Sequence, residues 1–181
     1  MTHINPSIHR SWTLALCAIA AIACAASADA QDSASAQAQA TKIAMIYNFG
    51  RFTLWPDSRF SHASDPVVVC IDPSDPLSEP FAGIDGKPLG GRSLAVRRTS
   101  KFDHACNMAY VSAANANDDY LATLREHGVL TIGETPGFSR AGAIRLTTIG
   151  RQVRFEINQR NAAQAGAQLS SNLMRLAISV R

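Results

Sequence analysis

The sequence has little charge, few cysteines and, beyond its first thirty residues, no long hydrophobic run. Only 17% of its 181 residues are charged, and the net charge is +3. The basic residues are scattered and do not alternate with aromatic ones, which argues against nucleic acid as a partner. Because 46% of the residues are hydrophobic, the chain can bury one sizeable core, and we predict one globular domain.

The sequence also lacks the usual signatures of catalysis. It contains no Gly-x-Ser-x-Gly elbow and no Gly-x-Gly-x-x-Gly turn after a strand. The loop Gly86–Gly91 does not have the spacing of a phosphate-binding loop, and His62, His104 and His127 stand apart from other candidate catalytic residues. We therefore expect no catalytic residues, no cofactor and no metal, and the chain is not predicted to be an enzyme.

The hydrophobic run at the start of the chain is typical of a secretory signal peptide. Apolar residues fill Trp12–Ala26, and small residues follow in the pattern of a cleavage site. The run is too short for a comfortable membrane span of about 20 residues, so we expect no membrane insertion after cleavage. We predict a leader at residues 1–30, a Gln/Ala/Ser-rich linker or loose helical turn at 31–40 and a domain at 41–181. Lipoprotein processing at Cys24 is a weaker alternative.

The order of hydrophobic segments predicts an α/β domain with a mixed β-sheet and helices on both faces. Strands that alternate with helices predict parallel pairing, whereas two alternating segments near the end predict an antiparallel hairpin turning at Thr148–Gly150. The expected strands are 66–71, 93–97, 106–111, 129–132, 143–147 and 151–157. The expected helices are 41–55 before Pro56, 75–82, 118–127 and a long final helix, Gln159–Val180, capped by Asn158.

Two cysteines, Cys70 and Cys106, remain once the predicted leader is removed. Both lie in predicted core strands, and an even number of cysteines in an exported protein favours a disulfide. Such a bond would stabilise the fold by roughly 4 kcal/mol on the chain-entropy model. Two buried free thiols are the main alternative, and a metal site that includes His104 is a weaker one.

Three places on the chain are candidates for binding. Phe52 and Trp55 lie near the end of the first predicted helix, where they either pack in the core or anchor a partner. Arg154 and Glu156 lie on the exposed face of the last strand, either as a solvated pair or as a charged recognition surface. The loop Gly133–Gly137 follows the carboxyl end of a strand, where α/β proteins often bind ligands.

Several blocks of the sequence together resemble the YfiR family over about residues 40–181. The most specific are Tyr-Asn-Phe-x-x-Phe-x-x-Trp-Pro within Lys42–Pro56 and Phe-Glu-Ile-Asn at 155–158. The other matching blocks are the strand ending in Cys70, the loop Gly90-Gly91-Arg92, Cys106, the strand Gly142–Leu146 and the Leu-rich final helix.

This resemblance implies a periplasmic repressor that binds the sensor domain of a membrane diguanylate cyclase or a related membrane receptor. Such repression lowers cyclic-di-GMP and biofilm formation, and it responds to redox state. The resemblance also implies that Cys70 and Cys106 match the family's intramolecular disulfide, although a second cysteine pair is absent and Ala167 replaces a larger aliphatic residue. It leaves a homodimer open. A periplasmic small-molecule sensor with a pocket near Gly133–Gly137 is the alternative function.

Overall fold

The computed structural model describes residues 33–181. The chain divides into two compact units, residues 1–38 and 39–181. In the first unit, residues 33–38 are described and are helical, whereas the predicted leader at 1–30 lies outside the described residues. Among the described residues, no helix combines the length and the apolar content that crossing a membrane requires.

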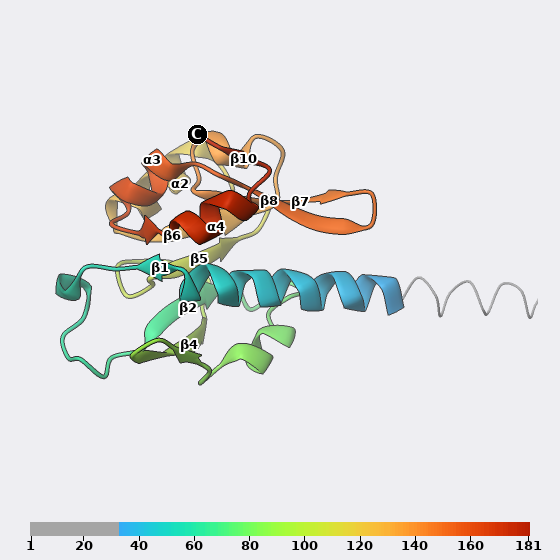
Figure 1. Cartoon of the computed structure of the whole chain (residues 1–181). Coiled ribbons are helices and arrows are strands. Elements are labelled where there is room, and N and C mark those ends of the chain that lie inside the picture. Colours follow the sequence, from blue (N-terminus) through green and yellow to red (C-terminus); the bar gives the residue numbers. More distant parts are fainter. Residues whose placement is uncertain (1–32) are drawn as a thin grey trace, which may run out of the picture. The chain divides into compact units, whose positions relative to one another are not determined.

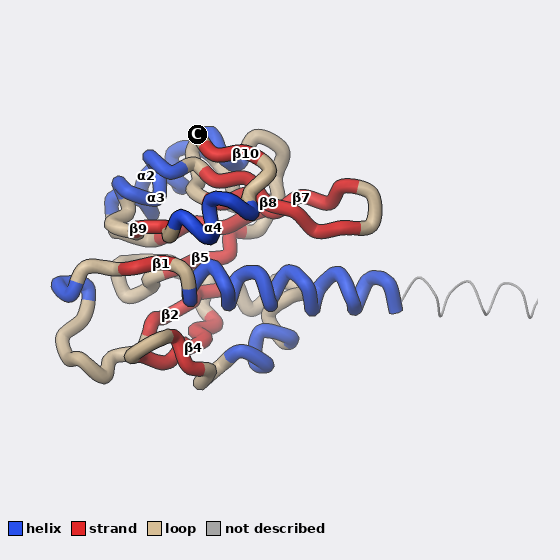
Figure 2. The backbone as a smooth tube through the Cα atoms, in the orientation of Figure 1, coloured by secondary structure: helices blue, strands red, loops and turns tan. Residues whose placement is uncertain are grey.

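A mixed sheet of eight strands forms the centre of the second unit (Figures 1 and 2). Its strand order is β10-β8-β7-β6-β5-β2-β4-β3. Strands β4, β2, β5, β6 and β7 run parallel, β8 is antiparallel to β7, and β10 is parallel to β8. The bounds are β2 Val67–Ile71, β3 Pro88–Leu89, β4 Arg92–Arg98, β5 Met108–Val111, β6 Leu130–Gly133, β7 Ile144–Ile149, β8 Gln152–Ile157 and β10 Ser179–Val180. The predicted mixed α/β sheet is confirmed.

The central strands are buried on both faces of the sheet, as their continuous apolar sequences predicted. On β2, Val67, Val69 and Ile71 belong to one core cluster, and Cys70 belongs to another. Since successive side chains of a strand point to opposite faces, the two clusters lie on opposite faces of the sheet. The first face is covered by the helical residues 39–51, called helix 39–51 below, and the second by α2 (Asp118–Glu126).

Local signals in the sequence explain where α2 and the hairpin begin and end. The Asn117 side chain accepts a hydrogen bond from the Tyr120 N–H at 2.9 Å and caps α2, and Gly128, with φ of 73°, follows its end. Strands β7 and β8 form the predicted antiparallel hairpin with six cross-strand pairs. The hairpin turns at Gly150 and Arg151, slightly later than expected, because Gly150 has the positive φ, 61°, that such a turn needs.

The prediction of one long helix at Gln159–Val180 is wrong. Gly166 adopts a left-handed conformation with φ of 72°, which ends the first helical segment. The Ser170 side chain then accepts from the Leu173 N–H at 3.2 Å and caps a new helix. The observed elements are α3 Gln159–Gln164, β9 Gln168–Leu169, α4 Ser171–Leu176 and β10.

The first predicted helix also ends earlier than Pro56. The helical residues are 33–51, and Thr53–Leu54 form β1, which pairs antiparallel with β9. Residues 33–40, predicted as a linker or loose turn, are therefore helical, consistent with their alanine content. The helix expected at 75–82 is also wrong, because turns lead into the 3-10 helix η2 (Pro80–Ile84). Two further 3-10 turns are η1 (Asp57–Arg59) and η3 (Phe138–Arg140).

Candidate functional site

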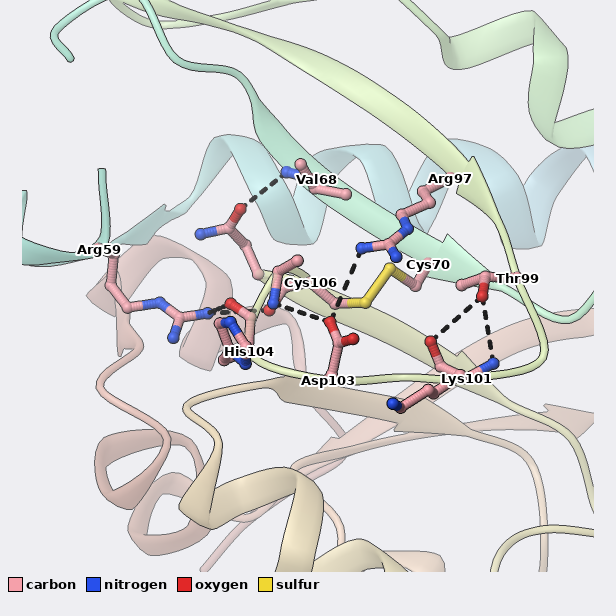
Figure 3. Close-up of a disulfide and its surroundings, with 11 residues drawn as sticks. Arg59, Val68, Cys70, Arg97, Thr99, Lys101, Asp103, His104 and Cys106 are labelled. Atoms are coloured by element: carbon pink, nitrogen blue, oxygen red, sulfur yellow. Dashed lines mark hydrogen bonds and ion pairs between the residues drawn. A yellow bond between two sulfur atoms is a disulfide. The ribbon is translucent and has the colours of Figure 1, made fainter. Parts of the chain in front are cut away.

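Cys70 and Cys106 form a disulfide that joins β2 to the segment just before β5 (Figure 3). The sulfur atoms are 2.01 Å apart, and both residues are fully buried. The interpretation as a disulfide is therefore confirmed, and that of two free thiols is wrong. Within the described part of the chain, no group of three or more His, Cys, Asp and Glu side chains could hold a metal ion.

Polar side chains fix the backbone on the Cys106 side of the bridge (Figure 3). Arg59 donates from Nη2 to the carbonyl oxygen of Cys106 at 2.8 Å and from Nη1 to that of His127 at 3.0 Å. Partial burial lowers the pKa of the Arg59 guanidinium. The pKa of Asp103 is lowered mainly by the hydrogen bond from the Ala105 N–H. Because the disulfide is buried, a reductant can reach it only after this segment opens locally.

Glu156 lies in a fixed polar cluster on β8. Its Oε1 accepts from Arg145 Nη1 at 3.2 Å, and its Oε2 accepts from Ser139 Oγ at 2.9 Å. The exposed fractions of the Arg145 and Glu156 side chains are only 19% and 17%. The predicted pair of Glu156 with Arg154 is thus replaced by a pair with Arg145, because residues directly opposite on neighbouring strands are closer than residues two apart on one strand.

The loop between β6 and β7 brings Ser139 to this cluster. Asn158 Nδ2 donates to the Ser139 carbonyl oxygen at 2.9 Å, and Asn158 Oδ1 accepts from the Asn161 N–H at 3.0 Å. The same asparagine therefore caps α3, as predicted, and holds the loop. Asn161 Nδ2 adds a bond to the Gly142 carbonyl oxygen at 2.9 Å. Sequence reasoning did not select Ser139 or Arg145, since neither has a local signal that links it to Glu156.

Arg154 and Glu156 share one face of the β7–β8 hairpin, which we call the outer hairpin face. Cross-strand pairing places six residues on it: Arg145, Thr147, Ile149, Gln152, Arg154 and Glu156. Strand β6 pairs with β7 only at Ile144 and Arg145, and β10 pairs with β8 only at Glu156 and Ile157. The rest of the hairpin extends past these neighbouring strands (Figure 1). Ile149 near its tip is 55% exposed.

Phe52 and Trp55 are half-buried and pack against the core cluster on the face of the sheet that helix 39–51 covers. Their position supports the core-packing interpretation, and the anchor interpretation stays a prediction. Leu54, between them, is 71% exposed. The Trp55 Nε1 atom is buried and has no hydrogen-bond acceptor among the described residues. One side of Trp55 borders a cleft that also contacts Arg51 and Arg92.

The loop after β6, where the sequence placed a candidate ligand pocket, carries an ionic network. Glu134 Oε2 is 2.8 Å from Lys42 Nζ on helix 39–51, and its Oε1 accepts from the Tyr110 hydroxyl at 2.6 Å. Burial raises the pKa of Tyr110, and the hydrogen bond to Glu134 raises it further. Burial also raises the pKa of Asp75. The network ties helix 39–51 to the carboxyl ends of the parallel strands, where doubly wound sheets often bind ligands.

Tyr110→Phe is expected to lower the free energy of unfolding by about 1.5–3 kcal/mol, because it removes a partly buried hydrogen bond to a carboxylate. Urea unfolding at neutral pH measures the change. Tyr47→Phe is the matched control, since the Tyr47 hydroxyl donates to the neutral carbonyl oxygen of Pro88 at 2.6 Å. The free energy of unfolding of this control should fall by only about 0.5–1.5 kcal/mol. Equal losses in the two variants would contradict the importance of the charged acceptor.

Comparison with known proteins places the chain in a family. No curated protein matches it. A solved structure of a conserved domain protein from Vibrio cholerae O1 biovar El Tor is similar over 64% of this chain and 55% of that one, with 12% identity and a TM-score of 0.48. A similarity this low carries no argument about function. Residues 39–178 match the sequence profile of the family described as YfiR/HmsC-like. The chain belongs to the YfiR/HmsC-like family.

Proposed function

We propose that this protein is a periplasmic regulator that binds the sensor domain of a membrane diguanylate cyclase, or a related membrane receptor, and holds it inactive. Repression of the cyclase would lower cyclic-di-GMP and biofilm formation. The observation that carries the proposal is the family match over residues 39–178. The outer hairpin face provides a surface on which such a partner can dock.

The outer hairpin face combines a fixed charge with a free one. Glu156 is held by Arg145 and Ser139, so its position is set before any partner arrives. Arg154 is exposed, and the structure shows no ion pair for it among the described residues. Charges arranged in this way contribute to specificity and association rate, and the exposed Ile149 adds apolar contact area. Repression then requires only that the regulator bind the inactive state of the receptor more tightly than the active one.

The disulfide supplies a physical route for the proposed redox response. Cys70, Cys106 and Phe138 belong to the same second-face core cluster. Phe138 precedes Ser139, which donates to Glu156. Loss of the bond between β2 and the segment before β5 would loosen this cluster and the loop that positions Ser139. Reduction is therefore expected to weaken partner binding through the outer hairpin face.

Arg154→Glu is expected to weaken binding of the sensor domain at least tenfold, about 1.4 kcal/mol, because it reverses the free charge on the outer hairpin face. The experiment mixes the purified exported chain with the periplasmic sensor domain of a membrane diguanylate cyclase from the same organism. Isothermal titration calorimetry measures the dissociation constant.

Arg160→Glu is the matched control for this experiment, because Arg160 is also an exposed arginine but lies on α3. It should bind like the parent chain. Failure of the parent chain to form a complex at micromolar concentrations would contradict the proposed function. A complex that R154E and R160E weaken equally would contradict the choice of surface.

A further inference from the structure

A cleft of about 390 Å³ lies between the end of helix 39–51, β1, the loop that follows it and the β3–β4 turn. Its volume falls in the lower part of the range of about 300–1,000 Å³ that small-molecule sites occupy. Two sequence blocks that are far apart, around Trp55 and around Gly90-Gly91-Arg92, meet here. The cleft is separate from the outer hairpin face, with which it shares no residue.

Apolar side chains, two of them aromatic, form part of the cleft wall beside polar groups. Trp55, Phe60, Leu54 and Leu89 line it. Because the Trp55 indole nitrogen is buried, the ring offers carbon atoms to the cleft and no hydrogen-bond donor. Leu54 is 71% exposed, so a ligand that covers it removes apolar surface from water. This apolar part of the wall suits a flat apolar group.

Arginine side chains give the cleft its positive charge. Arg92 lies with its guanidinium carbon 3.5 Å from the centre of the Phe60 ring, and its Nη1 donates to the carbonyl oxygens of His62, Ala63 and Asp65 at 3.1, 3.0 and 2.8 Å. This guanidinium is therefore held in one position. Arg51 is exposed at the end of the helix. With Asp57, the lining carries two positive charges and one negative charge.

Gly90 and Gly91 leave one side of the cleft open. No atom lies within 4 Å of the position that a Cβ atom would occupy at either residue. Gly90 has a φ of 62°, which favours glycine, whereas Gly91 does not have a positive φ. A side chain introduced at Gly91 therefore finds space without backbone strain, which makes this residue suitable for blocking the cleft.

We propose that this cleft binds a small organic anion with a flat apolar body, such as an aromatic carboxylate. The body packs on Trp55, Phe60 and Leu89, and the carboxylate pairs with the guanidinium groups of Arg51 and Arg92. Arginine suits this role because its planar fork matches a carboxylate. The inference goes beyond the proposed function and does not depend on it, since it concerns a ligand and a different surface.

Phenylacetate tests the proposal, with 2-phenylethanol as the uncharged analogue and acetate as the anion without a ring. Residues 31–181 contain one tryptophan, Trp55, because Trp12 lies in the predicted leader. Tryptophan fluorescence of the processed chain, or of the full chain carrying W12F, therefore reports on the cleft. Phenylacetate should change this fluorescence with a dissociation constant of about 1 mM or below. Both analogues should bind at least tenfold more weakly, because 2-phenylethanol lacks the carboxylate and acetate lacks the ring.

Arg51→Ala should weaken phenylacetate binding at least tenfold, because it removes a charge-assisted hydrogen bond to the carboxylate. Gly91→Phe should abolish binding by filling the cleft. Arg160→Ala and Gly83→Phe are the matched controls, since Gly83 also has no atom within 4 Å of its Cβ position but lies on η2. Melting temperatures without ligand verify that each variant is folded. If G91F does not fold, the binding of phenylacetate to R51A decides the outcome.

Lack of phenylacetate binding at about 10 mM would overturn the proposal. Unchanged binding in both R51A and G91F would also overturn it, because the ligand would then lie elsewhere. Inorganic phosphate that binds as tightly as phenylacetate would show a site for charge alone and would contradict the predicted apolar contact. Arg154→Glu should leave phenylacetate binding unchanged, so this proposal and the proposed function fail separately.

Discussion

The double variant C70A/C106A is expected to lose about 4 kcal/mol of unfolding free energy relative to the oxidised parent chain. The two cysteines are separated by 36 positions, and cross-linking them restricts the unfolded chain far more than the folded one. A loss of this size is a large part of the total of about 5–15 kcal/mol that stabilises a typical domain. Urea unfolding at neutral pH, followed by circular dichroism, measures the change.

The reduced parent chain is the internal control for this prediction. Reduction removes the cross-link but keeps both cysteine side chains. The unfolding free energy of the reduced chain should therefore fall by nearly as much as that of C70A/C106A. Mass spectrometry after alkylation verifies that the oxidised sample has no free thiol. An equal urea midpoint for the oxidised and reduced chains would show that the bridge does not stabilise the fold. The proposed redox response would then have no thermodynamic basis.

Gly142→Ala is expected to destabilise the fold by about 2–3 kcal/mol, at the upper end of typical overpacking effects. A Cβ atom at this position would lie 2.2 Å from the Phe138 ring, and one at Gly133 would lie 2.4 Å from it. Phe138 is only 3% exposed, so its ring is enclosed by neighbouring groups. The Gly142 N–H also donates to the Phe138 carbonyl oxygen at 2.7 Å, which limits movement of the backbone.

A smaller residue at position 138 should relieve this clash. The double variant G142A/F138L is expected to lose less stability than the sum of the two single changes, with a coupling of about 1 kcal/mol or more. Gly83→Ala is the control, because no atom lies within 4 Å of its Cβ position, and it should change stability by no more than about 0.5 kcal/mol. Strict additivity of G142A and F138L would contradict the proposed contact. Calorimetric melting curves provide the measurement.

The parts of the fold that were predictable from the sequence are those governed by local pattern. The β-branched segment Val67–Ile71 is a central strand, and Asn117 and Gly128 bound α2. Those that were not predictable depend on tertiary contacts. Strand β1 exists because Thr53 and Leu54 pair with β9, and β9 in turn depends on the left-handed Gly166. An apolar stripe with 3.6-residue spacing continues through such a break, so periodicity alone predicted one helix.

The candidate site shows the same division. Glu156 could be selected from its polar position in an alternating strand sequence, but its partner Arg145 depends on the hairpin register. Ser139 has no local signal at all. Lys42 and Glu134 are 92 positions apart, and only the packing of helix 39–51 on the sheet brings them together. Long-range ion pairs of this kind leave no periodic trace in one sequence.

The position of the disulfide within the chain has a consequence for biogenesis. Both cysteines precede β6, β7 and β8, and the ring that the bond closes contains β3 and β4 but none of the outer hairpin face. Under the proposed export, the chain emerges with its N-terminal part first, and its earlier segments begin to fold first. Oxidation can thus link β2 to the segment before β5 while the hairpin is still being translocated. The later strands would then assemble on a covalently closed template.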